Sequence, residues 1–86
     1  MKIQLSLFGA FREYDPAAQI TLEIADGACV AQLREAVASY GASHWPGFQP
    51  GLLARSAFAS DVAVMRDGDP VPAAGRMAVL PPVSGG

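Results

Sequence analysis

Residues 19–40, QITLEIADGACVAQLREAVASY, contain the change of hydrophobic period that decides the fold of this chain. In the first part, apolar residues alternate with polar ones, a pattern typical of a half-buried strand, at Ile20, Leu22 and Ile24. After the turn signal Asp26-Gly27, apolar residues recur with the spacing of one helix face, at Val30, Leu33, Val37 and Tyr40. The segment predicts a strand, a turn and then a helix over residues 29–40.

The segments before and after this stretch supply the remaining elements. Residues 2–8 alternate in the same way as residues 20–24, and the two segments predict an antiparallel hairpin. Gly41 is expected to end the helix in a left-handed conformation, and residues 41–51, rich in glycine and proline, are expected to form a loop. Three further segments are expected to form one or two helical turns, a strand and a final strand, respectively residues 52–58, 62–65 and 77–80.

The order of these elements predicts an α+β fold of the β-grasp (ubiquitin-like) type. One amphipathic helix and a one-faced sheet must cover each other, because neither buries its apolar side alone. We expect a mixed sheet of about four to five strands packed on one main helix. The near-continuous apolar character of residues 77–80 predicts a central strand that is buried on both faces. In a β-grasp fold this last strand lies beside the first. The expected organisation is one domain, residues 1–82, followed by a flexible C-terminal tail, residues 83–86.

Composition excludes several classes of function. Of the 86 residues, 51% are hydrophobic and 16% are charged, which is not the composition of a disordered chain. The six basic residues are scattered and the net charge is −2, so we expect no nucleic-acid partner. One cysteine and one histidine exclude an intramolecular disulfide framework and a four-cysteine metal site. No apolar run is long enough to span a bilayer, so we expect no membrane association and a cytoplasmic location.

Three groups of side chains invite a chemical role, and in each case a structural role is favoured. Asp67 and Asp69 flank a glycine, but the rest of a calcium-loop pattern is missing, which favours a solvated turn. His44-Trp45 has no carboxylate partner nearby in the sequence, which favours Trp45 as a lid over one end of the core. Cys29 stands at the expected helix start, where a thiol is a weak N-cap, and this reading is favoured over a reactive cysteine.

The end of the chain has the most informative pattern. The last predicted strand runs into Pro81-Pro82, and the sequence then closes with Gly85-Gly86. Prolines favour an extended exit, and residues without a Cβ can enter a channel too narrow for a side chain. The terminal α-carboxylate is ionised at neutral pH and is a poor electrophile. Chemistry at Gly86 would therefore require a separate enzyme that activates this carboxylate, since no ATP-binding motif is present.

The ending Leu80-Pro81-Pro82-Val83-Ser84-Gly85-Gly86 resembles that of the MoaD/ThiS family of β-grasp sulfur carriers, most of all the small subunit of molybdopterin synthase. Two internal segments are also similar to this family. They are the aromatic–small–x–x–Arg-Glu segment within residues 7–14 and the turn and helix start in residues 26–34.

The resemblance implies a division of labour among several proteins. An E1-like adenylating enzyme of the MoeB/ThiF type would use ATP to adenylate Gly86, and a persulfide donor protein would supply sulfur, leaving a C-terminal 1-thioglycine (thiocarboxylate). The large subunit of molybdopterin synthase (MoaE type) would receive the tail, where the sulfur attacks a cyclic pterin precursor. Gly85 would permit threading, and the extended approach would come from Pro81, Pro82, Val83 and Ser84. The chain would be a sulfur-donor subunit that binds no cofactor or metal and has no active site of its own.

One departure from the family keeps alternatives open. Ala74-Gly75-Arg76 replaces the acidic lead-in to the last strand that the family commonly has, and this leaves the identity of the partner open. A carrier for thiazole or cysteine synthesis is therefore the first alternative. A ubiquitin-like modifier joined to lysines through Gly86 is the second, and a plain β-grasp interaction module is the third.

Overall fold

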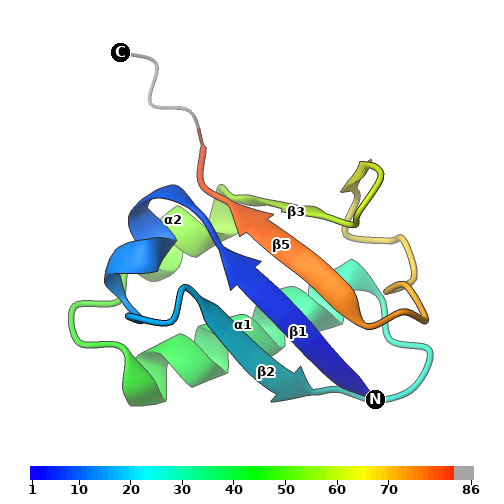
Figure 1. Ribbon diagram of the computed structural model, residues 1–86, viewed down its shortest axis with the longest axis horizontal. Helices are drawn as coiled ribbons and strands as arrows, with labels where there is room; N and C mark the ends of the chain where they lie inside the picture. The colour runs from blue at the N-terminus through cyan, green and yellow to red at the C-terminus, as the bar shows by residue number, and fades with distance from the viewer. Residues whose placement is uncertain (83–86) are drawn as a thin grey trace.

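The structure, a computed structural model, describes residues 1–82 and contains a five-stranded sheet, two α-helices and a short 3₁₀ helix. Along the chain these elements are β1 (Lys2–Leu7), η1 (Gly9–Glu13), β2 (Gln19–Glu23), α1 (Val30–His44), α2 (Pro50–Ala54), β3 (Ala57–Ala59), β4 (Val64–Met65) and β5 (Arg76–Leu80). Figure 1 shows the strands as one layer, with α1 crossing behind them.

The predicted hairpin is confirmed. β1 and β2 pair antiparallel with Leu5 opposite Ile20. Along β1, Ile3, Leu5 and Leu7 are buried, while the residues between them face outward, as the period of two requires. One face of the hairpin is therefore committed to the core and the other is left open.

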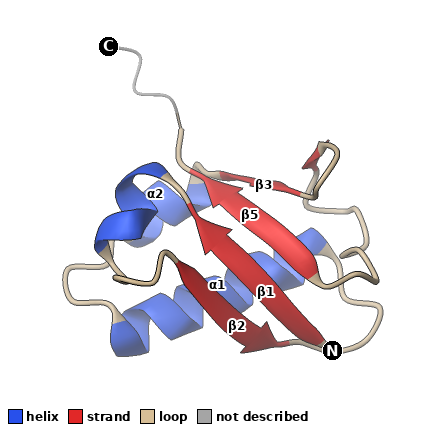
Figure 2. Ribbon diagram, in the orientation of Figure 1, coloured by secondary structure: helices blue, strands red, loops and turns tan. Residues whose placement is uncertain are grey.

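The order of the strands is β2-β1-β5-β3-β4. β5 runs parallel to β1, with Leu5 opposite Met77, and antiparallel to β3, with Phe58 opposite Val79. The expectation that the last strand lies beside the first is confirmed, and β5 is central. Its burial on both faces is not confirmed, because Met77 and Val79 are buried whereas Arg76 is exposed. A helix covers only one face of this sheet, so even the central strand keeps an open side (Figure 2).

The apolar stripe of α1 packs against the covered face of the sheet. Val30, Leu33 and Val37 are fully buried there, and the core continues through residues of η1, α2 and β3, namely Phe11, Leu53 and Phe58. This mixed sheet with one main helix is a β-grasp fold, as the order of the predicted elements indicates.

The predicted end of the main helix was wrong. α1 continues through Gly41 to His44, and Gly41 is buried inside the helix. A Cβ at Gly41 would lie 2.8 Å from the ring of Phe48 and 2.9 Å from that of Trp45. Glycine is needed here for close packing of aromatic rings, and not for a left-handed cap.

The predictions for residues 52–65 were partly wrong as well. The expected helical turns end at Ala54, and the following residues form β3. β4 contains only Val64–Met65, and Val62 is 92% exposed outside it. Val62 lies in a tight connection between β3 and β4 instead of in a strand. In this connection the Ser60 hydroxyl accepts hydrogen bonds from the backbone N–H groups of Val62 and Ala63, at 3.3 and 3.2 Å.

Within residues 1–82, neither α1 nor any other helix combines the length and the apolar character that crossing a membrane requires.

Candidate functional site

The candidate site is the point where the chain leaves the central strand. Leu80 is the last residue of β5 and pairs with Ala57 of β3. Pro81, which follows it, is half-buried, and Pro82 is exposed. Neither proline has an N–H to continue the ladder, so the sheet ends here. In Figure 1 the chain leaves at the end of the sheet toward which the arrowheads of β1 and β5 both point.

The structure places only part of the site that the sequence predicts. Pro81 and Pro82 lie at the base of the tail, directly after the central strand. The other predicted site residues lie outside the described residues, and these are Val83, Ser84, Gly85 and Gly86. The tail boundary at residue 83 also falls outside what the structure describes.

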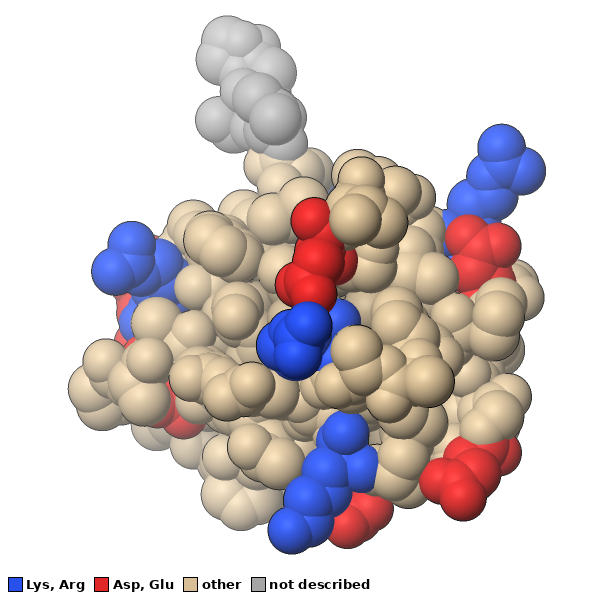
Figure 3. Space-filling view, turned by 45° about the vertical axis from the view of Figure 1, so that its right-hand side comes forward, with Lys and Arg blue, Asp and Glu red and all other residues tan. Residues whose placement is uncertain are grey.

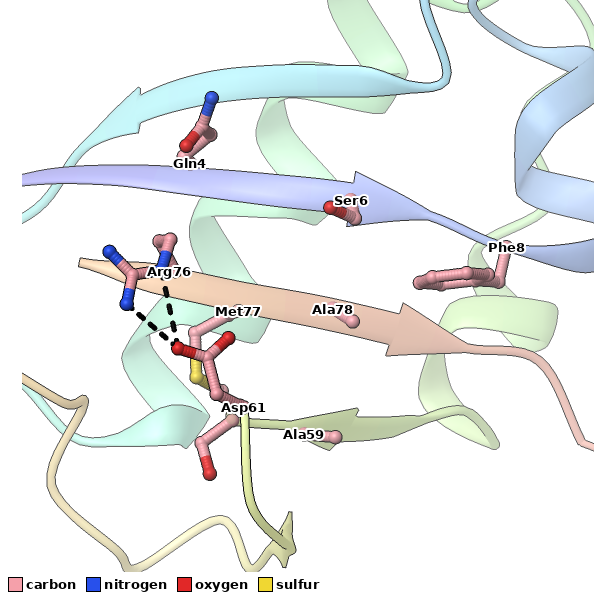
Figure 4. A pocket seen from close by; sticks show the side chains of 9 residues that line it. Gln4, Ser6, Phe8, Ala59, Asp61, Arg76, Met77 and Ala78 are labelled. Atoms are coloured by element: carbon pink, nitrogen blue, oxygen red, sulfur yellow. Dashed lines mark hydrogen bonds and ion pairs between the residues drawn. The ribbon is translucent and has the colours of Figure 1, made fainter. Parts of the chain in front are cut away.

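A shallow groove of about 200 Å³ lies on the open face of the sheet beside this exit, and we call it the open-face groove. Figure 4 shows it running over β1, β5 and the end of β3. Phe8, which is 45% exposed, lies at the end nearer the tail, and Arg76 lies toward the other end. The floor between them is formed by small or uncharged side chains, among them Ser6 and Ala78.

Sequence reasoning missed Phe8 as part of this surface. The sequence predicts Phe8 at the end of the first strand and within the segment of residues 7–14 that resembles the family, but not as part of a surface groove. The alternation in β1 nevertheless contained a signal, because Gln4, Ser6 and Phe8 follow each other at a period of two on the outward face. Its exposed ring adds an apolar side chain to the groove beside the tail exit.

The cationic departure from the family pattern, Arg76, is paired in this structure. Its guanidinium donates to one oxygen of Asp61, at 2.9 Å from Nη2 and 3.2 Å from Nε. Both side chains are more than half exposed, so the pair adds little stability, but it lowers the positive charge presented at this end of the groove. Charges elsewhere on the view in Figure 3 are also scattered, with positive and negative groups mixed.

The titration of the amino terminus is perturbed, at the opposite end of β1 from the tail. The Met1 amino group lies 3.0 Å from Asp26 and 3.5 Å from Glu23. The hydrogen bond that this amino group donates to Asp26, together with the charges of Asp26 and Glu23, outweighs desolvation and raises the pKa of the amino group above its ordinary value. This perturbed group is therefore separated from the candidate site by the length of the strand.

The side chains for which a structural role was favoured have structural partners. Asp67 accepts from Arg34 Nη2 at 2.8 Å, and Asp69 accepts from the Arg66 N–H at 2.8 Å, so the two carboxylates hold the turn and its neighbours together. Among residues 1–82, no three potential metal-ligating side chains come together. The hydrogen bonds of Asp67 and Asp69 support the structural interpretation of this turn.

The remaining two candidates also belong to the fold. Trp45 is 4% exposed and stacks on Tyr14 with ring centroids 5.0 Å apart, which confirms its reading as a lid over the core. His44 stacks on Tyr40 at 4.2 Å. Cys29 is the N-cap of α1, and its N–H donates to the Gln32 side chain at 2.9 Å, a bond that compensates for the weak thiol cap.

The fold and the site define a class: a small β-grasp domain whose central last strand leads into a Gly-Gly ending. The ThiS family matches residues 5–86, and the chain belongs to this family of β-grasp sulfur carriers. Among solved structures, the crystal structure of SAMP1 from Haloferax volcanii is similar, with a TM-score of 0.69 and 16% identity over 100% of both chains. At that identity the likeness concerns the fold. No curated protein matches the chain.

Proposed function

We propose that this protein carries sulfur as a thiocarboxylate on Gly86 and donates it to a cyclic pterin precursor, as the small subunit of a molybdopterin synthase. The observation that carries the proposal is the exit of the chain from the sheet. The ThiS-family match continues through residue 86, and Pro81 and Pro82 lead away from the end of the central strand β5.

The chemistry requires little from the folded body. An E1-like enzyme joins the Gly86 carboxylate to the AMP part of ATP and releases pyrophosphate, which converts a poor electrophile into an acyl group with a good leaving group. A protein persulfide displaces AMP, and cleavage of its S–S bond by a thiol leaves the thiocarboxylate on Gly86. The body then presents this soft nucleophile to the large subunit without releasing free sulfide.

The choice of pathway rests on the ending Pro81-Pro82-Val83-Ser84-Gly85-Gly86, which resembles that of molybdopterin synthase small subunits. In the proposed complex, Pro82 and the residues after it enter the large subunit, and the open-face groove beside the exit meets the surface around the entrance. Arg76, which departs from the acidic family pattern, is paired with Asp61, so this end of the groove presents little net charge to any partner.

The test of sulfur loading is intact-protein mass spectrometry after incubation with an E1-like enzyme, ATP and a persulfide donor. We expect a mass increase equal to the exchange of one oxygen for sulfur. A chain lacking Gly86 and a chain extended by one alanine are the controls, and neither is expected to gain sulfur. A wild-type protein that stays unmodified would contradict the carrier function.

The test of the pathway uses the sulfurated protein and a choice of acceptors. We expect a stable complex with a molybdopterin synthase large subunit and formation of the dithiolene from the cyclic precursor. Sulfur transfer to a thiazole synthase or a cysteine-synthase-like enzyme alone would replace the pterin assignment with one of those pathways. Isopeptide-linked adducts of Gly86 on lysines in cell lysate would instead indicate a protein modifier.

A further inference from the structure

The base of the tail rests on a glycine from the other end of the chain. Gly9 follows β1, has a φ of +56°, and faces the ring of Pro81. A Cβ built on Gly9 would lie 2.5 Å from Cγ and 3.3 Å from Cδ of that ring. Since real Cβ atoms essentially never come closer than 3.0 Å to another heavy atom, Pro81 occupies space that only a glycine leaves free.

Gly9 is held firmly in this place. On one side, the Leu7 N–H donates to the Ala18 carbonyl at 2.9 Å and fixes the end of β1. On the other, the Phe11 N–H donates to the Phe8 carbonyl at 3.1 Å, and the Phe11 ring is fully buried in the core. A side chain added at Gly9 would therefore displace Pro81 more readily than it would displace the backbone of residues 8–11.

Pro81 is also the first residue beyond the sheet. Leu80, just before it, is still paired with Ala57, so the position of the Pro81 ring sets the direction in which the next residues depart. We propose that Gly9 is a positioning residue for the tail: its lack of a side chain provides the seat for Pro81, and this seat aims the chain's end at the partner's entrance. The inference rests on the proposed function for its purpose, but not for its geometry.

The direction matters because the reacting atom is far from the seat. Five residues, 82–86, span at most about 17 Å when extended. In the extended conformation proposed for insertion into the partner, a modest rotation at Pro81 would move the carboxylate of Gly86 by several Å. In enzyme sites a misplacement of about 1 Å can cost on the order of 10²-fold in rate. At Gly86 we expect a smaller loss than this, of about tenfold.

The chain offers a matched control for a substitution at this glycine. Gly27, in the turn before α1, has a φ of +79°, and a Cβ there would meet nothing within 4 Å. Gly9→Ala and Gly27→Ala thus introduce the same methyl group into a left-handed backbone conformation. They differ in the contact with Pro81, which only the first substitution disturbs.

The kinetic test measures adenylation of the carrier by an E1-like enzyme at varied carrier concentration. For Gly9→Ala we expect kcat to fall roughly tenfold, while KM stays within about twofold because the docking surface of the body is intact. Gly27→Ala is expected to match the wild type. Equal kinetics for the two variants would overturn the proposal, and circular dichroism establishes that both are folded.

A second variant distinguishes a disturbed contact between Gly9 and Pro81 from general destabilisation of the protein. Pro81→Ala removes the two ring atoms closest to the built Cβ and leaves the Pro81 Cβ at 3.8 Å, an ordinary contact. We therefore expect Gly9→Ala to lower kcat in the wild type but to have no additional effect in the Pro81→Ala background. Additive losses in the double variant would contradict the seat.

A structural readout tests the seat independently of the proposed function. In a Cys29→Ser, Ser84→Cys protein, a nitroxide on the new cysteine broadens the amide NMR signals of the body that it approaches. Gly9→Ala is expected to change this broadening pattern, and Gly27→Ala to leave it unchanged. An unchanged pattern in Gly9→Ala would overturn the inference. If wild-type protein is never adenylated, the proposed function fails, and this readout alone decides whether the seat exists.

Discussion

Gly41 shows how one residue can have two opposite readings. Next to an apolar stripe, a glycine predicts a left-handed helix end, yet here it lies inside α1. Its neighbours in space, Phe48 and Trp45, occupy the volume that a Cβ would need. The sequence indicated Trp45 as a lid over one end of the core, but it contained no indication that Trp45 and Phe48 both pack against Gly41 of the helix. Local patterns reveal conformational preference, and they do not reveal close approach.

Replacement of Gly41 by alanine is therefore expected to destabilise the protein although alanine favours helices. The gain in helix propensity is up to about 1 kcal/mol, whereas overpacking in a core typically costs about 1–3 kcal/mol. Gly51 is a control inside α2, where a Cβ would meet nothing within 4 Å. Urea unfolding should show a loss for Gly41→Ala and no loss for Gly51→Ala. A stabilised Gly41→Ala protein would contradict the packing role.

At the scale of elements, the short segments are tied together by one side chain of α1. Arg34 Nη1 donates to the carbonyls of Leu53 and Ser56 at 2.8 and 2.7 Å, in the last turn of α2 and in the residue just before β3. Its guanidinium lies 4.9 Å from the centre of the Phe58 ring, and Nη2 is paired with Asp67. α2 and β3 are too short to be read from periodicity, since five and three residues contain at most one or two repeats. Contacts distant in the chain, such as these, define them.

The two carbonyl bonds should contribute more than the ion pair. Arg34→Met keeps an apolar stem but leaves both carbonyls without this donor, and we expect a loss of about 2–3 kcal/mol in the free energy of unfolding. Asp67→Asn retains an acceptor oxygen, and Asp67 is 58% exposed, so its loss should be below about 1 kcal/mol. Chemical denaturation of both variants measures the difference. Similar losses in the free energy of unfolding would mean that Arg34 stabilises the protein mainly through the ion pair, and not through its two hydrogen bonds to carbonyls.

At the scale of the whole molecule, the fold is closed by the pairing of its first and last strands. Gly75 leads into β5 with a φ of +74°, and its carbonyl accepts the Gln4 N–H at 2.7 Å. A Cβ at Gly75 would lie 2.7 Å from the backbone oxygen of Lys2. The segment Ala74-Gly75-Arg76, which departs from the family pattern, therefore contains a residue that the β1–β5 junction requires.

Gly75→Ala is expected to weaken this junction and with it the whole domain. Left-handed strain costs roughly 1–2 kcal/mol, and separating two backbone segments adds an overpacking cost of about 1–3 kcal/mol. Gly27→Ala again serves as the control, because it introduces only the strain. Guanidinium unfolding should show a clearly larger loss for Gly75→Ala. Equal losses for the two variants would show that the β1–β5 junction accommodates the methyl group.

The spacing of apolar residues along the chain was enough to predict the hairpin of β1 and β2, the helix α1 and the β-grasp class, because this spacing depends only on residues that are near one another in the sequence. The Pro-Pro and Gly-Gly ending likewise pointed to chemistry at Gly86 without any contact being known. Folding in three dimensions alone brought Gly9 beneath Pro81, Gly75 against Lys2 and Arg34 over the Phe58 ring of β3. These contacts join residues that are far apart in the chain, and no local spacing encodes the few tenths of an ångström that decide whether a side chain fits between them.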